Sequence, residues 1–182
     1  MNISDAIKVD TFYTRSINIE RDSNTQSVLN AYIPTTRSLK TLERIATTFH
    51  EDQAPRSWAL VGPYGSGKSA FAVFLTHLLG NLGSPANKTA LKKLRVSDKK
   101  LATQYKRYLR GRDAYCQVLL TGGPEPFCKA IVTKLAAAAE MFWQNKRGKK
   151  PLVIKQLKKA SQTELLTPSD VLQLIRTLQQ AV

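Results

Sequence analysis

The residues best suited to chemistry lie between Gly62 and Ser69, in the sequence Gly-Pro-Tyr-Gly-Ser-Gly-Lys-Ser. This octapeptide fits the pattern G-x-x-x-x-G-K-[ST] of a phosphate-binding loop at every fixed position. Glycines at these positions allow backbone conformations that are closed to other residues, and they leave room for phosphate oxygens. With ordinary amino-acid usage, a chance match in a chain of this length is roughly a one-in-a-hundred event. We therefore expect the loop to bind the phosphates of a nucleotide.

Each polar group of this loop has an expected role. The main-chain amides from about Gly65 to Ser69 should point into one concavity at the positive end of the following helix. Lys68 should reach the β- and γ-phosphates of ATP, and the Ser69 hydroxyl should ligate the accompanying Mg²⁺. Pro63 has no amide hydrogen and is not expected to donate to phosphate. The predicted nucleotide-binding residues are Gly62, Gly65, Ser66, Gly67, Lys68 and Ser69, and Ser69 is also the predicted metal ligand.

The segments on either side of the loop have the patterns of a strand and a helix. Trp58 to Val61 is a short apolar run, which is typical of a strand buried in a parallel sheet. After Ser69, apolar residues recur at helical spacing as far as Gly80, where the helix is predicted to end. Strand, glycine loop and helix are the context that the motif requires. The alternative interpretation is a Gly/Ser turn that happens to precede a helix.

Further helices and a second strand are predicted along the chain. Thr35 or Thr36 is expected to cap a helix with apolar residues at 39, 42, 45 and 49. Two basic helices are expected near 86–95 and 98–110, followed by an apolar strand over 114–123. The remaining predicted helices run from Pro124 or Glu125 to about Trp143, over 151–160, and over 168–181 with Thr167 as its cap. Alternating strands and helices predict parallel α/β layers.

The acid that nucleotide hydrolysis requires is missing from the predicted strands. Phosphoryl transfer to water needs a strand that ends in an acid to hold Mg²⁺, and a residue that orients the attacking water. The apolar run at 116–120 leads into Thr121, and the run at 151–154 leads into Lys155. Two strong strands are also few, because sheets usually have about four to six. We therefore assign no catalytic residue and expect little hydrolysis by this chain alone.

The order of these segments resembles the AAA+ and STAND P-loop ATPases, in particular their origin-recognition-like and bacterial (antiviral) defence-associated branches. The resemblance covers roughly Tyr32 to Phe142, and its most specific part is the Gly62–Ser69 motif, known as Walker A. It implies an α/β P-loop NTPase fold with a parallel sheet flanked by helices. The fold would be incomplete, because the Walker B strand and the lid are absent, and would carry a basic helical insert. It also places Tyr32, Ile33 and Pro34 near the adenine, although a hydrophobic staple onto the next helix fits these residues equally well.

The positive charge of the chain is concentrated in two segments. The net charge is +15, and residues 88–112 and 146–159 hold 17 of the 28 Lys and Arg residues. Such clusters bind nucleic acids by releasing phosphate counterions, whereas the alternatives are a solvated face or a surface for an acidic partner. Tyrosines at 105, 108 and 115 either stack on bases or pack internally. The candidate nucleic-acid contacts are Lys92, Lys93, Lys99, Lys100, Lys106, Arg107 and Arg110.

The domain organisation follows from the same patterns. We expect an N-terminal extended arm over 1–30 and a partial nucleotide-binding domain over 31–182, with the basic insert at 86–112. The missing elements indicate either part of a larger ATPase or a small protein whose site is completed in a homo-oligomer or a larger multi-subunit assembly. No apolar run is long enough to span a bilayer, the first ten residues do not read as a secretory signal, and two widely spaced cysteines suit a reducing compartment. These features predict a cytoplasmic protein without a membrane partner.

The sequence thus predicts the ATP-binding portion of a P-loop ATPase that acts on or near DNA. A non-hydrolysing, ATP-dependent regulatory or scaffold module is the main alternative, since the acidic strand is missing. A small-molecule kinase ranks lower, because residues 116–120 offer no acceptor-binding acid. Asn145-Lys146 is followed by Arg147-Gly148 and does not form a guanine-reading motif, which favours ATP over GTP.

Overall fold

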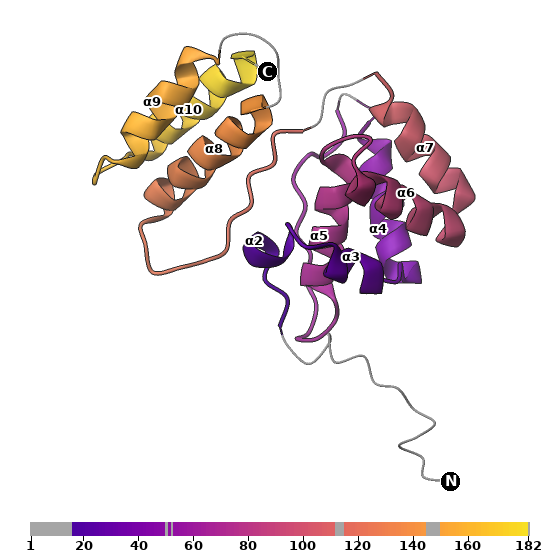
Figure 1. Ribbon diagram of the computed structural model, residues 1–182. Helices are drawn as coiled ribbons and strands as arrows, with labels where there is room; N and C mark the ends of the chain where they lie inside the picture. The colour runs from indigo at the N-terminus through magenta and orange to yellow at the C-terminus, as the bar shows by residue number, and fades with distance from the viewer. Residues whose placement is uncertain (1–15, 50, 52, 112–114, 145–149, 182) are drawn as a thin grey trace. The chain divides into compact units, whose positions relative to one another are not determined.

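The computed structural model describes residues 16–49, 51, 53–111, 115–144 and 150–181. Within these residues every regular element is an α-helix, and no strand occurs (Figure 1). The chain divides into two compact units, Met1–Tyr115 and Cys116–Val182. The helices of the first unit are α2 (Ile19–Asp22), α3 (Gln26–Ala31), α4 (Thr36–Thr47), α5 (Lys68–Leu79), α6 (Pro85–Ser97) and α7 (Lys99–Leu109), and those of the second are α8 (Phe127–Gln144), α9 (Leu152–Ser161) and α10 (Pro168–Ala181).

The predicted α/β fold with a parallel sheet is wrong. Both segments expected to be strands, 58–61 and the described part of 114–123, have no β-structure. Trp58, Leu60 and Val61 are 38%, 44% and 94% exposed, so the first segment is not buried either. A strand is stable only when a neighbouring strand pairs with its main-chain groups, and the described residues contain no such neighbour. The same finding contradicts the resemblance to AAA+ and STAND P-loop ATPases, because that fold is built on the sheet.

The predicted helix boundaries are confirmed where capping residues mark them. Thr35 caps α4 in a reciprocal arrangement with Ser38, whose hydroxyl accepts from the Thr35 amide at 2.8 Å. Asp98 separates α6 from α7, and its carboxylate accepts from the Leu101 amide at 2.8 Å. Helix α2 and all of α3 except Ala31 lie within residues 1–30, which were expected to form an extended arm. Local side-chain chemistry therefore fixes where α4 and α7 begin.

The core of the first unit lies between α3, α4, α5, α6 and α7. Leu42, Phe74, Leu94 and Tyr105 are fully buried and come from four of these helices. The Tyr105 hydroxyl donates to the main-chain oxygen of Leu42 at 2.9 Å, and burial raises the pKa of this tyrosine. Asn87 ties α6 to the end of α5, because its side-chain amide donates to two main-chain oxygens there at 2.9 and 3.2 Å. This packing holds α5 in place, and the last two residues of the predicted loop, Lys68 and Ser69, are the first two residues of this helix.

The second unit is a set of three helices, α8, α9 and α10, which lie side by side (Figure 1). Val132, Leu135 and Leu157 are among its buried residues. Thr167 caps α10 as predicted, and its hydroxyl and amide both donate to Asp170, which lowers the pKa of that carboxyl. Phe127, the first residue of α8, is 70% exposed. No helix in the described parts of either unit combines the length and apolar character needed to cross a membrane.

Candidate phosphate-binding loop and adjoining cavity

The backbone of the predicted loop adopts the conformations that its glycines permit. Gly65 and Gly67 have φ angles of 77° and 80°, in the left-handed region. Such a conformation costs roughly 1–2 kcal/mol for a residue with a Cβ atom, so both positions require glycine. A Cβ atom at either position would meet no other atom within 4 Å, which makes this requirement one of backbone conformation and not of space. The loop therefore turns sharply enough to lead directly into α5.

The main-chain amides at the end of the loop are open to a ligand. Gly67 is the N-cap of α5 and has no side chain with which to satisfy the first amides of that helix. Across the described residues, the amides of Gly67, Lys68, Ser69 and Ala70 have no hydrogen-bond acceptor. The first amide of α5 that is satisfied belongs to Phe71, which donates to Gly67 at 2.9 Å. Open amides and the positive end of the helix dipole together favour an anion at this position.

Lys68 holds its ammonium group over the same loop. Its Nζ donates to the main-chain oxygens of Gly62 and Pro63, both at 2.8 Å, and lies 3.4 Å from the Ser66 hydroxyl. A Cβ atom at position 62 would come within 3.0 Å of that hydroxyl, so glycine also permits the close approach here. The ammonium is thus folded back onto main-chain oxygens of the loop, and phosphate oxygens are acceptors that can replace them.

A cavity of about 440 Å³ adjoins the loop and lies within the first unit. This volume is in the usual range for small-molecule sites. Three cationic side chains line it, Arg37 and Arg44 from α4 and Lys68 from α5, whereas none of its lining residues is an Asp or a Glu. Trp58 also lines the cavity, and the Arg44 guanidinium lies 5.5 Å from the centre of its ring. The cavity therefore combines apolar walls with positive charge, which suits an organic anion.

The segment before α4 forms another wall of this cavity. Tyr32 and Ile33 both line it, whereas Pro34 does not. The Tyr32 ring stacks on Phe74 of α5, with ring centres 4.6 Å apart, and burial raises the pKa of its hydroxyl. The structure thus brings Tyr32 and Ile33 to the cavity that the loop borders, and contact with an adenine remains a prediction.

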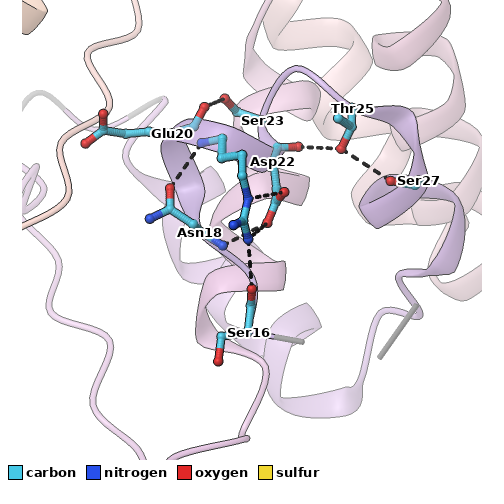
Figure 2. A network of polar contacts seen from close by, with 8 residues as sticks. Ser16, Asn18, Glu20, Asp22, Ser23, Thr25 and Ser27 are labelled. Carbon is cyan, nitrogen blue, oxygen red and sulfur yellow. Dashed lines mark hydrogen bonds and ion pairs between the residues drawn. The ribbon is translucent and has the colours of Figure 1, made fainter. Parts of the chain in front are cut away.

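A polar turn that sequence reasoning missed contacts the loop from the N-terminal side. Figure 2 shows its centre, the carboxylate of Asp22, which is 1% exposed and accepts from the Asn18 amide at 2.8 Å. The guanidinium of Arg21 donates to the same carboxylate and to the main-chain oxygen of Ser16. The Ser16 hydroxyl in turn lies 2.7 Å from the hydroxyl of Tyr64 in the loop. The turn therefore joins the loop through a contact that spans 48 residues, and no local sequence pattern indicates it.

Replacing Asp22 with alanine is expected to lower the free energy of unfolding by about 1–3 kcal/mol. The change leaves the Asn18 amide without its carboxylate acceptor. The Arg21 guanidinium also loses this partner, but its side chain is 61% exposed, so water replaces the lost hydrogen bonds. Urea denaturation followed by circular dichroism measures the effect. Glu51→Ala, which removes an exposed carboxylate, serves as the control and should change stability by less than about 0.5 kcal/mol. Equal stabilities of the two variants would contradict a structural role for Asp22.

The predicted nucleic-acid contacts occupy two kinds of environment. Lys93 donates to the main-chain oxygens of Asn30 and Tyr32 at 2.8 and 3.0 Å, so it is engaged inside the first unit. Tyr105 is fully buried, and Tyr108 stacks on Phe49 with ring centres 3.7 Å apart. The two tyrosines are therefore packing residues. The other predicted contacts are exposed, namely Lys92, Lys99, Lys100, Lys106, Arg107 and Arg110.

Comparison of the chain with profiles of known protein families, with curated proteins and with solved structures finds no match. Of the residues that the motif singled out, Gly62, Ser66, Gly67 and Lys68 line the cavity, whereas Gly65 and Ser69 do not.

Proposed function

We propose that the first unit binds ATP together with Mg²⁺, with the triphosphate on the Gly62–Ser69 loop and the nucleoside in the adjoining cavity. One observation carries this proposal: open helix amides and the Lys68 ammonium converge beside a cavity whose lining contains three cations and no carboxylate. A triphosphate satisfies these donors at once. The apolar walls at Tyr32, Ile33 and Trp58 suit a planar base.

The proposed Mg²⁺ ligand is the hydroxyl of Ser69, the second residue of α5. This hydroxyl has no partner among the described residues, and the side chain is half-buried beside Lys68. Magnesium commonly binds through one or two protein oxygens while phosphates and waters complete its coordination, so a single hydroxyl beside a triphosphate fits this mode. The cation would neutralise phosphate charge that the loop does not reach.

We expect binding with little turnover. Hydrolysis requires a group that orients water and an acid that supports the metal, and no carboxylate lines the cavity. Binding without turnover suits a regulatory or scaffold module, in which nucleotide occupancy orders the loop. The role of ATP would then be to fix a conformation of the first unit.

Calorimetric titration of the full chain tests the proposal, with phosphate release followed in the same samples. We expect Mg·ATP to bind, adenosine to bind much more weakly, and phosphate release to stay at the background rate. ATP without Mg²⁺ should bind more weakly than Mg·ATP if the proposed contact of the metal with the Ser69 hydroxyl contributes to affinity. Adenosine binding as tight as that of ATP, or no ATP binding, would contradict the role of the loop. Phosphate release above background would contradict the absence of turnover.

A further inference from the structure

The outward faces of α6 and α7 carry a dense group of cations, which we call the α6–α7 basic face. Its side chains are all exposed, and none forms an ion pair or a side-chain hydrogen bond with any described residue. The one acid in this part of the chain, Asp98, is committed to capping α7. The face comprises Lys88, Lys92, Arg95, Lys99, Lys100, Lys106, Arg107 and Arg110.

Helix geometry places these cations away from the core. In α7, Leu101, Tyr105 and Leu109 form the buried stripe. Lys100 and Arg107 lie on the opposite side of that helix, and Lys99 and Lys106 flank the stripe. Residues 88, 92 and 95 form one row on α6, because they follow at intervals of four and three. Like charges at this spacing repel by roughly 0.2–0.5 kcal/mol per pair, so the rows lower stability until a polyanion neutralises them.

We propose that the α6–α7 basic face binds the phosphate backbone of duplex DNA without reading its sequence. Clustered cations gain affinity for DNA by releasing condensed counterions, and phosphate contacts alone carry no base specificity. This interaction is independent of nucleotide binding, since no residue of the face lines the cavity.

The aromatic residues of these helices favour a duplex over a single strand. Surfaces for single-stranded nucleic acid combine positive charge with exposed rings on which bases stack. Tyr105 and Tyr108 are the aromatic residues of α6 and α7, and both rings are packed, the first in the core and the second against Phe49. Tyr115, which follows α7, is exposed, and its hydroxyl lies 2.7 Å from that of Tyr108. The two helices therefore offer charge without stacking surfaces.

Lys93 provides a matched control within the same helix. It is adjacent in sequence to Lys92, yet its ammonium is held by main-chain oxygens of Asn30 and Tyr32. Lys92→Ala and Lys93→Ala remove the same charge from α6. The proposal requires that they differ, because only Lys92 belongs to the basic face.

The test measures the affinity of the full chain for a fluorescein-labelled duplex of arbitrary sequence between about 50 and 200 mM salt. The logarithm of the binding constant should decrease linearly with the logarithm of the salt concentration. We expect the magnitude of this slope to be smaller by about 1 for Lys92→Ala and by about 2 for Lys92→Ala/Lys99→Ala. Lys93→Ala should lower the melting temperature but keep the wild-type slope. Lys40→Ala, an exposed change on α4, gives a second control whose fold is not in question. Scrambling the duplex sequence should not change affinity.

Several outcomes of these measurements would overturn the proposal. The first is the absence of duplex binding at the lowest salt concentration. Others are an unchanged slope in the double variant, equal slopes for Lys92→Ala and Lys93→Ala, and tighter binding of the single strand than of the duplex. If vesicles containing phosphatidylserine bind the chain while duplex DNA does not, the face meets a membrane surface, and the proposal is likewise rejected.

Discussion

Replacing Lys68 with alanine is expected to weaken Mg·ATP binding by roughly 10- to 150-fold while the helical content stays unchanged. A hydrogen bond from a charged donor contributes about 1.5–3 kcal/mol, which corresponds to this range of affinities. The Lys68 ammonium contacts main-chain oxygens of Gly62 and Pro63 at the surface, so its removal exposes no buried group. Loss of the ammonium should therefore lower the affinity for Mg·ATP far more than it lowers the stability of the fold.

Lys40→Ala is the matched control for this change. Lys40 is exposed on α4, does not line the cavity, and its replacement lowers the net charge equally. We expect calorimetry to give the wild-type dissociation constant for Lys40→Ala within about twofold, which is close to the usual context-dependent scatter of surface changes. If both variants lose affinity alike, the attraction is a general effect of net charge and the loop is not the site. Wild-type affinity in a folded Lys68→Ala chain would place the triphosphate elsewhere.

Local signals in the sequence predicted the helices well. Thr35 and Thr167 mark helix starts through hydrogen bonds to residues three positions on, so neighbouring residues alone determine them. The apolar residues at helical spacing in α5 include Phe74, which is fully buried. For Tyr105 and Tyr108 the sequence left packing and base stacking open, and the partners at Leu42 and Phe49 decide for packing.

The sheet was predicted wrongly because strand formation depends on distant residues. The run at 58–61 has the apolar composition of a strand, yet composition describes only how a segment would fit a pleated surface once a partner is present. The presence of two apolar segments in a sequence does not establish that they pair with each other as strands. The contact of Ser16 with Tyr64 and the bonds of Lys93 to Asn30 and Tyr32 were missed for the same reason, since they join residues 48 to 63 positions apart.

The geometry of the candidate loop does not depend on the sheet that was wrongly predicted, because the residues that determine it are close together in the sequence. Gly65, Gly67 and the first turn of α5 supply the positive φ angles and open amides without help from a sheet. Lys68 reaches back only five or six residues to its acceptors. What the helices add is the cavity, since α4 contributes Arg37 and Arg44 to its lining. The loop geometry thus follows from the sequence, whereas the shape of the nucleoside pocket depends on helix packing.

Replacing Phe74 with alanine is expected to lower the free energy of unfolding by about 3–5 kcal/mol, the range for removing a buried aromatic ring. Phe74 is fully buried on α5, and its ring supports the stacked ring of Tyr32 in the cavity wall. Urea denaturation measures the loss, and Phe127→Ala is the control, because that ring is 70% exposed and should contribute less than about 0.5 kcal/mol.

Phe74→Leu separates the effect on stability from the effect on the cavity. Leucine keeps most of the buried volume and should cost only about 1 kcal/mol, so this variant remains folded even if Phe74→Ala does not. It removes the aromatic surface against which Tyr32 stacks, at 4.6 Å between ring centres. If that stack shapes the nucleoside pocket, Phe74→Leu should weaken ATP binding while inorganic triphosphate, which needs only the loop, binds as before. Equal weakening of both ligands would mean that Phe74 supports the position of α5 and its open amides, and that the wall at Tyr32 does not hold the base.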